Sequence, residues 1–131
     1  MHHRISVCTA CRPKGQNEKP GMGLITKLSE QLSITDPALA EQFKVSGVAC
    51  MAGCDRPCTV GFHASNKATY LFGDIEGEED LASLVEFAAL YACLHDGWCS
   101  SVDRPARLRK KTLARVPASL FAAQPTPEPD R

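Results

Sequence analysis

Residues 44–58 have the sequence KVSGVACMAGCDRPC, in which a short run of small and β-branched residues leads into three cysteines. The run over residues 44–49 predicts a β-strand that ends at Cys50. Residues 51–57 contain glycine, proline and charged side chains, and they predict a loop. This cysteine group is therefore expected to leave the C-terminal end of a strand.

The other cysteine group, near the N-terminus, is expected in the same setting. Residues 5–8 (ISVC) alternate in character and predict a short strand that carries Cys8 at its C-terminal end. Cys11 follows three residues later. Residues 12–23 are rich in Gly, Pro and Lys, and they predict a loop.

Two helices are expected between these two strands. Leucines recur every four residues over 24–32 and predict a helix with one buried face. The pair Asp36-Pro37 is typical of a helix start, an N-cap followed by proline at the first helical position, and predicts a second short helix over residues 38–43. A connection of this kind suits a crossover between two parallel strands.

The second half of the chain predicts a hairpin and a longer helix. Residues 59–64 and 68–72 flank a three-residue turn, which is a hairpin pattern. Acidic residues over 76–80 suit a helix start, and apolar residues at helical spacing carry that helix to about His95. The order of elements predicts an α/β fold, a thioredoxin-like sandwich with a mixed four-stranded sheet and helices packed on it.

Length and composition predict one ordered domain. The chain has 131 residues, of which 44% are hydrophobic, enough for a single core. We expect a metal- or cluster-binding domain over residues 1–117 and a flexible, proline-rich tail over residues 118–131. The sequence has neither a long apolar run nor the apolar stretch of a signal peptide, so we expect a cytoplasmic protein.

Charge is unevenly distributed although the net charge is zero. The first 103 residues carry 8 Lys/Arg and 13 Asp/Glu, whereas the segment 104–115 carries six Lys/Arg and no acid. The acidic body argues against broad nucleic-acid binding. The basic segment is expected to be mainly solvated, with some docking on the body.

Seven cysteines in a cytoplasmic chain indicate metal binding or redox chemistry rather than disulfides. Thiolates separated by two or three residues can bind one metal ion or cluster while the loop bends round it. The pairs Cys8/Cys11 and Cys50/Cys54 supply the four ligands that a cluster or a structural zinc requires. These four residues are therefore the predicted metal ligands, and the spacing leaves the metal open.

The other three cysteines are less specific. Cys58 fits either a further ligand or a core residue, and a core role is the more common one for a buried thiol. Cys93 is expected to pack within an apolar helix, and Cys99 has no assigned role.

No histidine is predicted as a ligand. His2 and His3 are expected on a free chain end. His63 is expected to be structural on a strand, and His95 is expected near a helix C-terminus, where it favours the helix dipole.

Several motifs together resemble a known family. They are an N-terminal Val-Cys-x-x-Cys-Arg, the segment VACMAGCDRPCTV, the hairpin end TYLFGD at residues 69–74, and later Ala-Ala-Leu-Tyr-Ala and Arg-Pro pieces. Over about residues 4–117 the chain resembles the uncharacterised bacterial "predicted metal-binding" family. That family is itself similar to the thioredoxin-like 2Fe–2S ferredoxins.

The resemblance implies a 2Fe–2S cluster held by Cys8, Cys11, Cys50 and Cys54, and electron transfer rather than catalysis on a substrate. For such a carrier, the acidic body suits docking to a basic patch on a redox protein partner, either a reductase or an oxidase. Neither a nucleic-acid nor a membrane partner is expected. The resemblance also allows a homodimer and a link with cobalt and corrinoid metabolism. The first two cysteines stand closer together here than thioredoxin-like ferredoxins usually space them, so the cluster type stays open.

Two other functions remain open at this point. The same cysteine spacing fits zinc in a structural or metal-delivery protein. A Cys-x-x-Cys near a strand end also fits a thiol–disulfide redox protein, although the prolines and glycine after Cys11 predict no helix there. The sequence has no phosphate loop, nucleophile elbow or convincing carboxylate pair, so a substrate-transforming enzyme is not expected.

Overall fold

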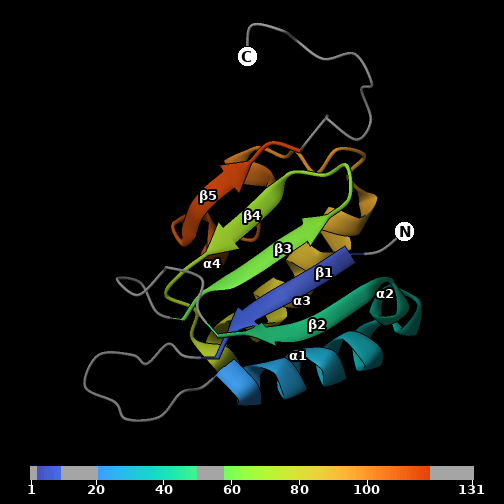
Figure 1. Cartoon of the computed structure of the whole chain (residues 1–131), viewed down its shortest axis with the longest axis vertical. Helices are drawn as coiled ribbons and strands as arrows, with labels where there is room; N and C mark the ends of the chain where they lie inside the picture. Colours follow the sequence, from blue (N-terminus) through green and yellow to red (C-terminus); the bar gives the residue numbers. More distant parts are fainter. Residues whose placement is uncertain (1–2, 10–20, 50–57, 119–131) are drawn as a thin grey trace, which may run out of the picture.

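The structure is a computed structural model, and it describes residues 3–9, 21–49 and 58–118. It contains one five-stranded sheet in the order β2-β1-β3-β4-β5 (Figure 1). The strands are β1 (His3–Cys8), β2 (Phe43–Val48), β3 (Val60–Ala64), β4 (Thr69–Phe72) and β5 (Thr112–Val116). The helices are α1 (Gly21–Thr35), α2 (Pro37–Gln42), α3 (Gly77–Cys93), α4 (Ala106–Arg109) and the short 3₁₀ helix η1 (Ser101–Asp103).

The pairing of the strands confirms the predicted α/β sandwich. β1 and β2 are parallel, with Cys8 opposite Val48. The other neighbours, β1 with β3, β3 with β4 and β4 with β5, are antiparallel. The predicted crossover and the predicted hairpin are therefore both present.

The sheet has one more strand than the predicted four. β5 pairs with β4 and lies at the edge of the sheet. Its sequence, TLARV, contains an arginine and follows a run of basic residues, so it lacks the apolar alternation that marks a strand. An edge strand needs a neighbour on one side only, and here β4 supplies the pairing that the local sequence does not indicate.

The helices in the crossover follow the predicted order with shifted ends. α1 begins at Gly21, inside the segment predicted as a loop, and runs to Thr35. α2 starts at Pro37, and the Asp36 carboxylate accepts hydrogen bonds from the next turn, as predicted for an N-cap. Phe43, expected at the end of α2, instead opens β2 and is buried.

The core lies between the sheet and the two long helices. α1 buries its predicted leucine face, and α3 crosses behind the sheet in Figure 1. The Phe87 ring on α3 meets the rings of Phe62, Tyr70 and Phe72 edge to face, with centroids 4.8, 5.1 and 5.0 Å away. This packing holds α3 against β3 and β4.

Two expectations about single residues are wrong. His3 was expected on a free end, but it lies in β1 with 3% of its surface exposed, and its Nε2 is 2.8 Å from the Nζ of Lys67. Cys93 was expected to pack in the core, but it is exposed at the last turn of α3. His3 lies near the start of the chain and Cys93 at the last residue of a helix. At such positions sequence periodicity says little about tertiary contacts.

The remaining expectations concern the histidines and the tail. His63 lies on β3 as predicted, with its Nε2 3.0 Å from the Ser6 hydroxyl, and His95 follows the end of α3. The predicted tail over residues 118–131 falls, beyond residue 118, outside the described residues. None of the helices in the described part of the chain has the length and apolar character that crossing a bilayer requires.

Candidate metal centre

The C-terminal ends of β1 and β2 lie side by side and carry the cysteine segments (Figure 1). The Thr9 N–H donates to the Val48 carbonyl over 2.9 Å, so the two chains stay together beyond the last paired residues. The Cys8 sulfur lies 3.9 Å from the carbonyl oxygen of Ala49. Thr9 and Ala49, the last described residues before the two cysteine segments, therefore lie together at this end of the sheet. Cys11, Cys50 and Cys54 belong to residues 10–20 and 50–57, which lie outside the described residues.

The chain also returns to the same place after each of these segments. Gly21, the first residue of α1, packs so closely on β1 that an added Cβ would overlap the Cys8 carbonyl oxygen and come within 2.9 Å of the Thr9 Cα. Cys58, which follows the second segment, packs its side chain against Cys8. All four residues that flank the two cysteine segments thus converge at one end of the sheet.

The structure describes one of the four predicted ligands, Cys8. The structure places Cys8 at the end of β1 with 1% of its surface exposed, as expected for a ligand delivered by a strand. Cys11, Cys50 and Cys54 lie outside the described residues. In the described ranges, no group of three or more His, Cys, Asp or Glu side chains comes together to hold a metal ion.

The donor chemistry at this end of the sheet fits a metal with a preference for sulfur. Cys8 and Cys58 form a small buried cluster of their own, each with 1% exposure. Thiolate sulfur is the usual ligand of iron–sulfur clusters and a common ligand of zinc. Sequence reasoning left the role of Cys58 open, and only the tertiary contact with Cys8 brings it to the site.

Two opposing electrostatic effects act on the thiols at this end of the sheet. The amino end of α1 packs against Cys8, and the Ile75 N–H, two residues before α3, donates to the Cys58 carbonyl over 3.1 Å. Helix amino ends carry partial positive charge and stabilise thiolates nearby. Burial raises the pKa of the Cys58 thiol, and the neighbouring Cys8 raises it further, so a cation bound between these sulfurs would relieve an unfavourable pairing.

A buried carboxylate fastens the neighbouring loop. Asp80, fully buried near the start of α3, accepts from the Glu76 N–H over 2.7 Å, from Arg107 Nε over 2.6 Å and from Lys111 Nζ over 2.5 Å. Burial alone would raise the pKa of Asp80, but the hydrogen bonds from Glu76, Lys111 and Arg107 outweigh it and hold the pKa below its ordinary value. Because Glu76 follows Ile75, this network also positions the Ile75 N–H, which donates to the Cys58 carbonyl.

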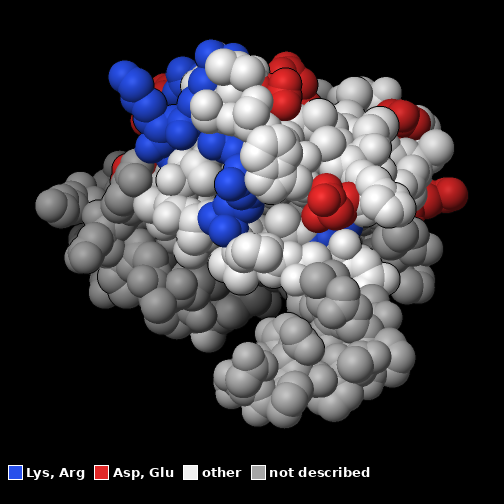
Figure 2. Space-filling model, turned by 90° about the horizontal axis from the view of Figure 1, so that it is seen from above, with Lys and Arg blue, Asp and Glu red and all other residues white. Residues whose placement is uncertain are grey.

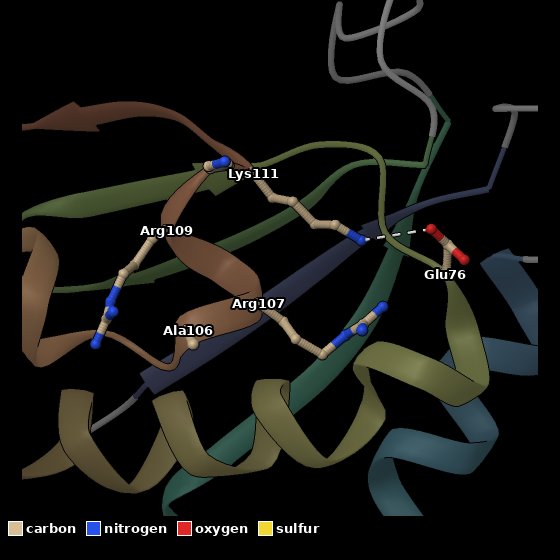
Figure 3. A pocket seen from close by; sticks show the side chains of 6 residues that line it. Glu76, Ala106, Arg107, Arg109 and Lys111 are labelled. Carbon is tan, nitrogen blue, oxygen red and sulfur yellow. Dashed lines mark ion pairs between the residues drawn. The ribbon is translucent and has the colours of Figure 1, made fainter.

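Sequence reasoning missed this role of Asp80, since an acid in the first turn of a helix is explained by the helix dipole alone. The network is also where the basic segment docks on the body. The Lys111 side chain extends from the left toward Glu76 in Figure 3, with 3.8 Å between their charged atoms.

The surface beside this network is hollowed and basic. A depression of about 480 Å³ is lined by Glu76, Ala106, Arg107, Arg109, Lys110 and Lys111 (Figure 3). Arg109 is turned away from Glu76 and donates to the carbonyls of Arg104 and Val102. Figure 2 shows Lys and Arg gathered on one side of the face seen there, with Asp and Glu scattered elsewhere. Arg109 therefore stabilises the segment's own turn, whereas Arg107 and Lys111 attach the segment to the body through Asp80.

The remaining two described cysteines lie away from Cys8. Cys99 belongs to the main core, where its N–H donates to the Tyr70 hydroxyl over 3.0 Å and its sulfur lies 3.3 Å from the same oxygen. Burial raises the pKa of Tyr70 to about 12, so the phenol stays protonated. Cys93 lies at the far end of α3 from the loop that binds Cys58.

The fold has close counterparts among solved structures. A thioredoxin-like [2Fe-2S] ferredoxin from Aquifex aeolicus superposes with a TM-score of 0.58 at 18% identity, covering 87% of this chain and 92% of that one. A second structure of the wild-type ferredoxin has a TM-score of 0.55 at 18% identity and covers 86% and 97%. A cysteine-to-serine variant of it has a TM-score of 0.55 at 19% identity and covers 86% and 98%. At such identities the likeness establishes the thioredoxin-like fold alone.

Sequence comparison identifies the family. No curated protein matches the chain. The family model "Protein of unknown function (DUF1636)" matches residues 5–118. The chain therefore belongs to this family, which confirms the resemblance drawn from the cysteine and hairpin motifs.

Proposed function

We propose that the protein is an electron carrier that binds a 2Fe–2S cluster through Cys8, Cys11, Cys50 and Cys54. The observation that carries the proposal is that the described residues flanking the two cysteine segments, Thr9, Gly21, Ala49 and Cys58, all lie at one end of the sheet. Thr9 and Ala49, from which the segments leave, follow parallel neighbouring strands that are in register at Cys8 and Val48. Two chelating pairs on adjacent strand ends are the arrangement that a four-thiolate centre needs.

The fold supports an iron–sulfur cluster over other thiolate centres. The ferredoxins to which the chain is similar are described as thioredoxin-like [2Fe-2S] proteins, and the likeness covers most of both chains. A bound cluster would supply a reversible one-electron couple, whose potential depends on net charge, hydrogen bonds to sulfur and exposure. In this chain the amino end of α1, next to Cys8, is suited to stabilise the negative charge of such a centre.

The partner proposed for this carrier is a redox protein, a reductase or an oxidase, in the cytoplasm. The described surface supports a protein partner better than a nucleic acid. Arg107 and Lys111 are paired with Asp80 and its acidic neighbours rather than presented as an uncompensated basic face.

Zinc is the second candidate, because the same thiolates would bind it tetrahedrally. A structural zinc is less needed here, since the described residues form an extensive core without it. Thiol–disulfide exchange is less favoured, because a catalytic thiol must be accessible and Cys8 is buried.

The test is a metal and sulfide analysis of protein purified without oxygen and without a histidine tag, with visible spectra before and after dithionite. About two irons and two sulfides per chain, with colour that bleaches on reduction, would support the proposal. A colourless protein with about one zinc per chain would replace it with the zinc function. A metal-free protein whose thiols oxidise reversibly in pairs would replace it with thiol–disulfide exchange.

A further inference from the structure

We propose that Cys58 is a ligand of the same metal centre as Cys8. The inference rests on the proposed thiolate metal centre and revises its ligand set. It starts from the contact between the two side chains, which are buried together at 1% exposure each. Cys99, equally buried, lies in the main core instead, and Cys93 is exposed.

The backbone holds Cys58 in place from two sides. Its carbonyl accepts the Ile75 N–H over 3.1 Å, and the next residue, Thr59, accepts the Cys8 N–H over 3.0 Å. The Cys58 side chain is thus anchored beside the end of β1 before any metal binds. Ligands held by a rigid scaffold in this way need little reorganisation on binding.

Ordinary core packing explains this pair less well. Core cysteines normally join the main apolar cluster, as Cys99 does here. Within the described residues, Cys8 and Cys58 form a separate buried cluster with no aliphatic or aromatic member. Two sulfur donors set apart from the core, at the end of the sheet where the cysteine segments converge, are better suited to share a metal.

The chain pattern agrees with this assignment. Cys58 follows Cys54 at the same spacing at which Cys54 follows Cys50, a Cys-x-x-x-Cys in each case. On binding, the Cys58 thiol gives its proton to solvent and its sulfur forms one bond to the metal, with no change in oxidation state. The predicted ligands Cys8, Cys11, Cys50 and Cys54 already fill the four thiolate positions of such a centre. If Cys58 binds together with Cys8, one of the other three predicted ligands lies outside the centre.

The experiment compares Cys58→Ser with Cys99→Ser, which removes an equally buried thiol, and Cys93→Ser, which removes an exposed one. Each full-length protein is purified anaerobically, and its iron, sulfide and visible spectrum are measured. The affinity for added Co²⁺ is also measured from its thiolate charge-transfer absorption. Cys58→Ser should lose the centre or shift its spectrum and should bind Co²⁺ at least about tenfold more weakly, whereas both controls should match the wild type.

The outcomes separate this inference from the proposed function. Iron and sulfide in the wild type with an unchanged Cys58→Ser spectrum would overturn the inference and leave the electron carrier standing. A wild type without iron–sulfide whose Co²⁺ binding depends on Cys58 would overturn the electron carrier and support the inference. A wild type that binds no metal would overturn both.

A measurement on the unmodified chain guards against misfolding of the variant. In wild-type protein labelled with ¹³C-cysteine, loading with Zn²⁺ should move the Cβ resonances of Cys8 and Cys58 together and leave that of Cys99 in place. A Cys58 resonance that stays with Cys99 would overturn the inference.

Discussion

Gly21 packs against Cys8 so closely that no larger residue fits between α1 and the end of β1. A Cβ at Gly21 would overlap the Cys8 carbonyl oxygen and lie within 2.9 Å of the Thr9 Cα, all of them backbone atoms that cannot turn aside. The absence of a side chain is what lets the amino end of α1 reach the candidate metal centre. The link between helix and strand end depends on this one position.

We therefore predict that Gly21→Ala destabilises the protein and displaces the Cys8 segment. Overpacking of this kind costs about 1–3 kcal/mol, which a urea titration of the metal-free protein would measure. The metal-loaded protein should also lose its metal to a chelator faster than the wild type.

The matched control is Gly23→Ala, two residues along the same helix, where a Cβ would meet nothing within 4 Å. Alanine favours a helix over glycine, so this variant should be as stable as the wild type or slightly more stable. Equal stabilities for the two variants would show that the close packing at Gly21 is not rigid.

A second prediction concerns the carboxylate that fastens the loop before α3. Asp80→Asn leaves Arg107 and Lys111 without their buried anion, and removing one partner of a buried ion pair costs about 3–5 kcal/mol. Because the Arg107 side chain is 47% exposed and solvent can compensate its charge, we expect the lower end of this range, about 3 kcal/mol. The free energy of unfolding from urea titrations should fall by an amount of this order. The metal should also be held less tightly, because the Ile75 N–H that binds Cys58 precedes this network.

Glu78→Gln is the control for Asp80. Glu78 lies in the same first turn and pairs with Lys27 over 2.6 Å, but 80% of its side chain is exposed, so solvent screens the pair. Its replacement should leave stability within error of the wild type. An Asp80→Asn protein as stable as Glu78→Gln would contradict the role assigned to Asp80.

Asp80 should also make the stability of the protein depend on pH in the acidic range. The pKa of Asp80 is lower in the folded protein than its ordinary value of 3.8. Its contribution to the free energy of unfolding is therefore complete well above that value and is lost as the pH falls toward the lower pKa of the folded protein. The wild type should therefore lose more stability than Asp80→Asn between about pH 5 and pH 2. Parallel losses over this range, measured by denaturant titration, would show that Asp80 is not held as an anion.

His3 should make stability depend on pH closer to neutrality. Burial, and then the charge of Lys67 only 2.8 Å away, lower the pKa of His3 below its ordinary 6.5. The unfolded chain therefore takes up this proton first, and stability falls as the pH drops below about 6.5. His3→Gln should flatten the decline, whereas His95→Gln, at an exposed position, should not. A decline of equal size in His3→Gln would assign it to other groups.

Much of the fold was predictable because its signals are local. The leucine face of α1, the Asp36-Pro37 start of α2, the hairpin and the crossover all follow from periodicity and capping residues close together in the chain. β5 was not predictable, because an edge strand takes its pairing from β4 rather than from its own alternation. The prediction that His3 lies on a free chain end was wrong for a related reason. The burial of His3 involves Lys67, which is far away in sequence.

The candidate site, too, has features that the sequence predicted and features that only the tertiary structure shows. Spacing alone identified the cysteine groups and placed Cys8 at a strand end, where it lies. Spacing did not show that Cys58 packs on Cys8, that Gly21 brings α1 to the site, or that Asp80 ties α3 to the basic segment. Each of these is a contact between distant parts of the chain, which only the assembled sheet creates.

The most direct test of the electron-carrier account is electron paramagnetic resonance of the anaerobically purified protein before and after reduction with dithionite. A 2Fe–2S centre predicts a silent oxidised protein and, after uptake of one electron, a signal from a single unpaired spin per cluster that disappears on reoxidation. A protein with no such signal in either state, and with zinc or no metal in place of iron, would contradict the account.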